Sequence, residues 1–152
     1  MKYSEEYMHC DKCEATYSKG EHHISKRIQK LMKAAIEVAK KSEMPQFRHG
    51  AILFNYGSVM SIGVNDGGYS SFGARFQTID QHIATHHAEI KCILRQPKSV
   101  TRGAIIVVAR VNNNNEVRFS KPCEMCQQIA KFTGVKKIYY SVDENAIGIV
   151  RL

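Results

Sequence analysis

The sequence predicts a mixed α/β fold, in which helices cover the faces of a sheet of about five strands. Apolar residues recur at helical spacing over residues 24–42, an apolar run at 104–111 is typical of a strand buried on both faces, and 135–142 is predicted to form another strand. A helical segment at 122–132 separates these two strands. Strand–helix–strand units of this kind favour a mixed sheet with helices packed against it.

The first half of the chain is expected to form a helix, a hairpin and a loop. Apolar residues over 24–42 share one face of a helix, and Pro45 lies just beyond it as a stop. Apolar runs at 51–54 and 59–64 flank an Asn-Tyr-Gly turn, which favours a β-hairpin because Asn and Gly tolerate positive φ. The polar segment 65–85 is predicted to be a loop, and loops of this length usually carry function or move.

The second half is expected to alternate helices with strands. A short helix at 86–95 precedes the first buried strand, and a helix at 122–132 precedes the second, with Gly134 as its C-cap. A final strand follows at 147–152. The link 143–145 between the last two strands is too short for a helix, so we expect these strands to pair as an antiparallel hairpin.

Composition favours one globular domain of 152 residues that carries a polar N-terminal arm at 1–23. No stretch approaches the roughly 20 apolar residues of a membrane span, and no signal peptide is evident at the N-terminus. We therefore expect a cytoplasmic protein without a membrane partner. The formal net charge of +8 fits either a well-solvated surface or attraction to polyanions and anionic small substrates.

The five cysteines indicate metal binding. An odd number of cysteines without a secretion signal argues against a disulfide framework. Two Cys-x-x-Cys pairs remain, Cys10 with Cys13 and Cys123 with Cys126, and such pairs in a reducing compartment are typical of metal sites. Cys92 lies on an apolar stretch and is expected to be a core thiol.

Two short motifs begin predicted helices, His87-Ala88-Glu89 and Pro-Cys-x-x-Cys at 122–126. The free N–H groups at a helix start favour thiolates over thiols. Two such starts that face each other would place His87, Cys123 and Cys126 around one zinc ion, with the fourth position left for water. Zinc lowers the pKa of that water, so that hydroxide is available near neutral pH.

Glu89 is predicted to move protons. It is too close to His87 in sequence for both side chains to bind the same zinc easily, but it is well placed to hydrogen-bond the water. A carboxylate there can accept the water's proton, pass it to a ring nitrogen and then protonate a departing amine. One group thus acts first as general base and then as general acid.

The two motifs resemble the signature of the cytidine and deoxycytidylate deaminase superfamily. Gly50-Ala51 and Gly63-Val64-Asn65 resemble further motifs of that superfamily, and the resemblance covers roughly residues 24–152, which would form the catalytic domain. It implies a three-layer α/β/α cytidine-deaminase-like fold and a Zn²⁺ cofactor. It also implies that Asn65 contacts the sugar or base of the substrate, with Ala88 as a second contact.

The resemblance further implies a reaction in which zinc-bound hydroxide attacks C4 of a cytosine base and yields uracil. The expected substrate is a free pyrimidine nucleoside or nucleotide, as in pyrimidine salvage. Two alternatives stay open: deamination of a base in nucleic acid (adenosine in tRNA or cytosine in a single strand), and a non-catalytic zinc scaffold. Glu89 argues against the scaffold. The predicted C-terminal hairpin resembles members that act on free cytidine, and small relatives imply a homo-oligomer, a dimer or higher.

Two further groups of residues carry weaker expectations. Cys10, Cys13, His22 and His23 resemble a second, structural zinc site found in some deoxycytidylate deaminases, and the alternative is a loose polar arm. Arg75, in the segment 65–85, would meet a substrate phosphate, and the alternative is an ordinary exposed loop.

Overall fold

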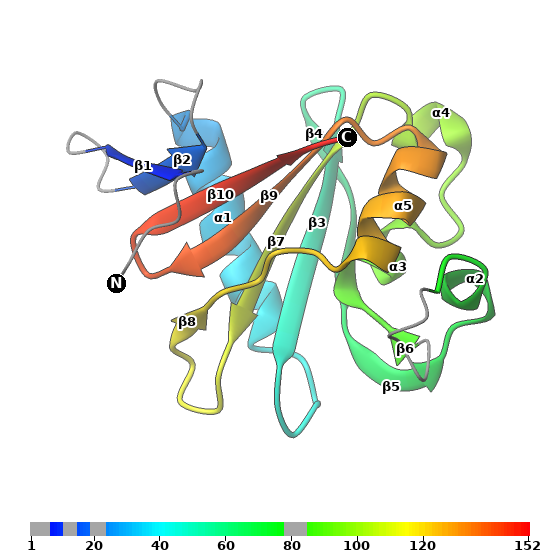
Figure 1. Cartoon of the computed structure of the whole chain (residues 1–152), viewed down its shortest axis with the longest axis horizontal. Coiled ribbons are helices and arrows are strands. Elements are labelled where there is room, and N and C mark those ends of the chain that lie inside the picture. Colours follow the sequence, from blue (N-terminus) through cyan, green and yellow to red (C-terminus); the bar gives the residue numbers. More distant parts are fainter. Residues whose placement is uncertain (1–6, 11–14, 19–23, 78–84) are drawn as a thin grey trace.

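The computed structural model describes residues 7–10, 15–18, 24–77 and 85–152, and a mixed sheet lies at its centre (Figure 1). The strands of this sheet are β3 (Arg48–Asn55), β4 (Ser58–Val64), β7 (Ile105–Val111), β8 (Val117–Arg118), β9 (Lys137–Asp143) and β10 (Ala146–Arg151). Their order is β10-β9-β7-β3-β4, with β8 added beside β7. Strands β7 and β9 run parallel, while the other neighbours are antiparallel.

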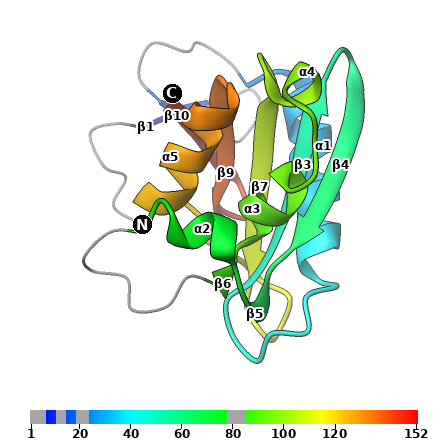
Figure 2. The same cartoon turned by 90° about the vertical axis from the view of Figure 1, so that its right-hand side faces the viewer.

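Helices cover both faces of the sheet, which confirms the three-layer α/β/α fold (Figure 2). Helix α1 (Lys26–Ala39) packs on one face, where Ser25 caps it by accepting a hydrogen bond from Ile28 N at 3.2 Å. Helices α3 (Ala88–Ile93) and α5 (Glu124–Thr133) pack on the other face, and the short helix α4 (Lys98–Thr101) follows α3. Among the helices that the structure describes, none has the length and apolar character needed to cross a membrane.

Both predicted hairpins are present. The sequence favours positive φ at Asn55 and Gly57 in the turn between β3 and β4. In the structure, positive φ occurs at Tyr56 and Gly57 instead. Strands β9 and β10 pair antiparallel, which confirms the predicted C-terminal hairpin. Gly134 ends α5 with a φ of 91°, as a C-cap glycine does.

Two glycines let helices approach the sheet closely. A Cβ on Gly50 of β3 would lie 2.7 Å from the carbonyl oxygen of Ala35 in α1. A Cβ on Gly63 of β4 would lie 2.6 Å from the carbonyl oxygen of Ala88 at the start of α3. Any larger residue would push these backbones apart, so the glycines of the Gly-Ala and Gly-x-Asn motifs have a packing role.

Segment 65–85 contains more regular structure than the predicted loop. Strand β5 (Asp66–Tyr69) pairs with β6 (Thr85–His86), and α2 (Ser71–Ala74) lies between them. The Ser70 side chain caps α2 by accepting a hydrogen bond from Gly73 N at 2.9 Å. The sequence predicts a loop here from its polarity and glycine content. Strands and helices of two to four residues are too short to show a periodic pattern, so the sequence does not indicate them. Residues 78–84 lie outside the described part of the chain.

Part of the N-terminal segment forms a hairpin. Strands β1 (Tyr7–Cys10) and β2 (Ala15–Ser18) pair antiparallel, and β2 lies beside β10 (Figure 1). The backbone of Cys10 ends β1, whereas Cys13, His22 and His23 lie outside the described residues. The second zinc site therefore stays a prediction.

Candidate metal centre and active site

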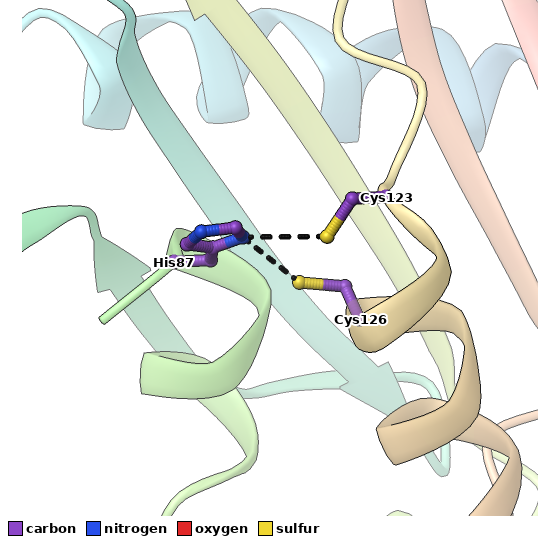
Figure 3. Close-up of side chains that lie close together, drawn as sticks. All are labelled: His87, Cys123 and Cys126. Carbon is purple, nitrogen blue, oxygen red and sulfur yellow. Dashed lines mark hydrogen bonds between the residues drawn. The ribbon is translucent and has the colours of Figure 1, made fainter. Parts of the chain in front are cut away.

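Three of the predicted ligands lie together. The ring of His87 points toward Cys123 and Cys126, and its Nδ1 lies 3.5 Å from Cys123 Sγ and 3.3 Å from Cys126 Sγ (Figure 3). The three donor atoms all lie within 4.8 Å of one another. One imidazole nitrogen and two thiol sulfurs are a donor set that zinc takes readily, and three protein ligands leave a coordination position for water.

The ends of two helices hold these side chains in place. His87 is the N-cap residue of α3 and Cys123 is the N-cap residue of α5, so both ligands leave the backbone where free N–H groups favour negative charge. The segment before Cys123 is fixed by Ser120, whose backbone N–H donates to the Ser141 carbonyl at 2.8 Å. Gln127 adds a bond from Nε2 to the Pro122 carbonyl at 2.8 Å.

The two thiols of the cluster differ in their pKa values. A hydrogen bond from Cys126, supported by one with His87, lowers the pKa of the Cys123 thiol to about 4. Burial, followed by the hydrogen bond to Cys123, raises the pKa of the Cys126 thiol well above its usual value. The pKa of His87 is raised chiefly by its hydrogen bond with Cys123. Cys123 is thus already a thiolate at neutral pH, whereas Cys126 must lose its proton when a metal binds.

A cavity of about 320 Å³ opens beside this cluster. Its walls include Ala88, Glu89 and Asn65 together with His87 and Cys123, so the predicted substrate contacts Asn65 and Ala88 share one space with the metal ligands. Glu89 is buried in the first turn of α3, with 4% of its surface exposed. A carboxylate in this position can contact whatever the cavity binds, because Glu89 lines the cavity together with His87 and Cys123.

Asn65 is tied to the chain that leads into β3. Its Oδ1 accepts hydrogen bonds from His49 N at 2.8 Å and from Ser42 Oγ at 2.7 Å. Its Nδ2 donates to the Phe47 carbonyl at 2.7 Å. Both lone pairs of the amide oxygen are therefore used, and Nδ2 keeps one N–H that can reach a ligand.

Sequence reasoning missed other residues of the cavity wall, namely Met44, Phe47, His49, Ser120 and Lys121. His49 is the most informative. Its Nδ1 lies 2.8 Å from the Phe47 carbonyl, and a ring nitrogen bonded to a carbonyl must carry the proton, so Nε2 is the acceptor. Burial lowers the pKa of His49, which keeps the ring neutral. Its place directly before the Gly50-Ala51 motif is the signal that could have indicated it.

Other predicted residues lie elsewhere. Arg75 follows α2, where its guanidinium lies 5.7 Å from the centre of the Phe72 ring, and it is not among the described residues that line the cavity. Its contact with a substrate phosphate therefore stays a prediction. Cys92 is fully buried and its thiol donates to the Glu89 carbonyl at 3.1 Å, which confirms a core thiol.

His86, the neighbour of His87, pairs with Asp66 instead of joining the metal ligands. Its Nδ1 lies 3.0 Å from Asp66 Oδ1, and Lys91 Nζ lies 3.0 Å from Asp66 Oδ2. The hydrogen bond from Lys91 is the main reason that the pKa of Asp66 is lowered to about 2. These contacts tie β5 and β6 to α3 at the edge of the cavity.

The fold and this donor cluster define the class of zinc-dependent hydrolases of the deaminase type. The chain belongs to the family described as the cytidine and deoxycytidylate deaminase zinc-binding region, whose model matches residues 25–142. This membership confirms the superfamily that the motifs resemble and, with the His87–Cys123–Cys126 group, Zn²⁺ as the cofactor. A comparison with curated proteins gives no match.

Solved structures share the fold. The dCMP deaminase of cyanophage S-TIM5, in its apo form, has a TM-score of 0.54 and 23% sequence identity, over 81% of this chain and 88% of that chain. RibD of Acinetobacter baumannii, form 2, has a TM-score of 0.50 and 19% identity, over 77% of this chain. The matched part is 28% of the RibD chain, so the likeness concerns one region of that larger protein.

Proposed function

We propose that this protein is a hydrolytic deaminase that converts a cytosine base to uracil in a free nucleoside or nucleotide. The observation that carries the proposal is the buried Glu89 carboxylate, which lines the same cavity as His87 and Cys123. A zinc scaffold needs the ligands alone and has no use for a buried carboxylate beside them, whereas a hydrolase needs a group that moves protons.

His87 Nδ1 and the sulfurs of Cys123 and Cys126 would hold the zinc ion. When bound, zinc lowers the pKa of a water molecule, so that hydroxide is available near neutral pH. The start of α5 stabilises the thiolate charge of Cys123, and the Ser120 and Gln127 hydrogen bonds hold the segment that leads into Cys123.

Glu89 performs the proton transfers in this proposal. It accepts a proton as water adds to C4 of the base, and it delivers that proton to the adjacent ring nitrogen N3. A second transfer moves the remaining proton of the C4 hydroxyl through Glu89 to the amino group, which leaves C4 as ammonia while the C4 carbonyl of uracil forms. The sum is one water consumed and one ammonia released, so one carboxylate serves as base and acid in turn.

The cavity suits a small ligand. Its volume of about 320 Å³ lies at the lower end of the range for small-molecule sites. Asn65 Nδ2 and His49 Nε2 supply one donor and one acceptor in its wall, which matches the mixed donor and acceptor edge of a pyrimidine nucleoside. The antiparallel β9–β10 hairpin adds support, because this ending resembles that of superfamily members that act on free cytidine.

A panel of substrates tests the proposal. Purified zinc-loaded protein is incubated with cytidine, deoxycytidine, their 5′-monophosphates, adenosine, single-stranded DNA and tRNA, and ammonia release is followed. We expect ammonia from one or more of the free pyrimidine compounds. Ammonia only from a polynucleotide, with a rate that falls steeply as salt rises, would instead establish a nucleic-acid deaminase, because release of counterions dominates such binding.

A further inference from the structure

A second cavity adjoins the first across the side chain of Phe47. It also measures about 320 Å³ and is lined by Gln46, Phe47, Arg110 and the turn residues 112–114. Phe47 lines both cavities, so a ligand that extends past its ring passes from one to the other. Figure 1 shows the turn between β7 and β8 beside the segment that leads into β3, which is where this second cavity lies.

Phe47 is held in an unusual backbone conformation at this boundary. Its φ is 53°, in the left-handed region that bulky residues rarely adopt. Its carbonyl oxygen accepts two hydrogen bonds, from Asn65 Nδ2 at 2.7 Å and from His49 Nδ1 at 2.8 Å. Such strain persists only where surrounding contacts enforce it, and it concentrates at ligand sites. Phe47, which is 55% exposed, is therefore held by its backbone at the boundary of the two cavities.

Arg110 lies in the second cavity with hydrogen-bonding capacity to spare. Its guanidinium carbon stands 4.4 Å from the centre of the Phe47 ring, so the ring fixes the plane of the group. Nη1 makes a long bond of 3.4 Å to the Phe119 carbonyl. Nε is buried and has no hydrogen-bond partner among the residues that the structure describes. Nη1 makes only this long bond to a described residue, so the terminal nitrogens keep N–H donors that a ligand in the cavity can use.

The charges around Arg110 also favour an anion. None of the described residues that line the second cavity is acidic, and all but Phe47 carry side-chain N–H donors. Burial and the nearby charge of Arg118 lower the pKa of Arg110. Arg118 pairs with Glu116 at 3.0 Å, but Arg110 forms no ion pair with a described residue. An anion in the cavity would relieve the repulsion between the two guanidinium groups.

We propose that the second cavity binds the phosphate of a substrate whose base lies beside Glu89, with the sugar passing over the Phe47 ring and Arg110 donating hydrogen bonds to phosphate oxygens. A planar guanidinium with fixed orientation is suited to two parallel bonds to a phosphate. This inference rests on the proposed deaminase function and deepens it, because it makes the preferred substrate a phosphate-bearing pyrimidine. The phosphate is either the 5′-monoester of a nucleotide or a phosphodiester of a strand.

Steady-state kinetics of Arg110→Gln test the inference. The wild type is expected to have a lower KM for a phosphate-bearing pyrimidine than for the matching nucleoside. Arg110→Gln is expected to raise that KM about 10–100-fold, the loss expected for hydrogen bonds to a charged group, and to leave the nucleoside KM within about twofold. A loss with CMP or dCMP identifies the monoester as ligand, and a loss with a short cytosine oligonucleotide identifies the phosphodiester.

Arg27→Ala is the matched control. Arg27 of α1 also lies over an aromatic ring, at 5.8 Å from the centre of Phe54, but on the opposite face of the sheet. It is expected to change neither KM. Arg75→Ala tests the rival position beside Phe72, and a nucleotide-specific loss there with none in Arg110→Gln would overturn the inference. Equal losses of Arg110→Gln on nucleoside and nucleotide would overturn it as well.

A binding measurement keeps the inference separate from the proposed deaminase function. Inorganic phosphate is expected to raise the melting temperature of the wild type and of Arg27→Ala, but not of Arg110→Gln or Arg110→Lys, since Lys lacks the planar fork. An equal rise in the Arg110 variants would contradict the phosphate site. Absence of ammonia release from every pyrimidine, with the Arg110-dependent rise intact, would instead count against the deaminase function alone.

Discussion

Asn65 Nδ2 donates a hydrogen bond of 2.7 Å to the carbonyl oxygen of Phe47. Through this bond the last residue before β5 holds the strained backbone at the mouth of the active-site cavity. Oδ1 of the same side chain accepts hydrogen bonds from His49 N and Ser42 Oγ. Asn65 therefore positions two walls of the cavity, Phe47 and His49, in addition to the substrate contact that the sequence motif implies.

Asn65→Ala is expected to weaken both the fold and substrate binding. Loss of three hydrogen bonds, at about 1 kcal/mol each, should lower the free energy of unfolding by roughly 2–3 kcal/mol. Urea unfolding measures this loss, and kinetics should show a raised KM. Asn145→Ala, in the exposed β9–β10 turn, is the control and should change neither quantity. A raised KM with unchanged stability would restrict Asn65 to direct substrate contact.

Cys123→Ala is expected to lose the active-site zinc, because the cluster keeps only one sulfur and one nitrogen donor. Loss of a tightly bound metal should lower the melting temperature by roughly 5–10 °C. Zinc content by mass spectrometry and a thermal melt check both effects. Cys92→Ala removes a more deeply buried thiol on the same face of the sheet and should keep its zinc. Full zinc in Cys123→Ala would refute the ligand assignment.

The N-terminal cysteines make a separate prediction about stoichiometry. If Cys10 and Cys13 bind a structural zinc with His22 and His23, the wild type holds two zinc ions per chain and Cys10→Ala holds one. Cys123→Ala should then also hold one, and the double variant none. A single zinc in the wild type would limit metal binding to the His87 cluster.

Zinc binding is expected to release protons and to weaken as the pH falls. The raised pKa of Cys126 means that its thiol is protonated at pH 7 before the metal arrives, so zinc must displace that proton. The raised pKa of His87 adds competition between protons and zinc as the pH falls. Protons compete little with zinc at Cys123 near neutral pH, because the pKa of this thiol is about 4. Calorimetry at pH 7 in buffers of different ionisation enthalpy should show at least one proton released per zinc, and no release would contradict this picture.

The metal centre could be predicted from the sequence because its chemistry is local. His87 and Cys123 each begin a helix, and the spacing of Cys126 brings it to the same end of α5. The rest of the cavity depends on contacts between distant segments. Nothing in the sequence around Phe47 indicates a positive φ, since that conformation is enforced by hydrogen bonds from Asn65 and His49.

The sequence indicates the second cavity only weakly. Arg110 lies within the predicted buried strand 104–111, as the one charged residue of an otherwise apolar run. A lone arginine near the end of a buried strand must find partners, and it finds the Phe47 ring, which lies 63 positions earlier in the chain. The periodicity of the strand could not indicate that partner, because pairing of β3 with β7 decides which residues meet there.

Glu89→Gln separates proton transfer from metal binding. Gln has the same shape and fills the same buried position, and it leaves His87, Cys123 and Cys126 unchanged, so zinc content should equal that of the wild type. The amide cannot accept a proton from water, and turnover should fall by about 10²–10⁴-fold, the usual contribution of a general acid or base. Glu124→Gln is the matched control, since Glu124 occupies the first turn of the other ligand-bearing helix but is exposed. It should retain full activity. An active Glu89→Gln protein with normal zinc would mean that another group carries the protons, and His49, neutral and in the same cavity, would be the next residue to replace.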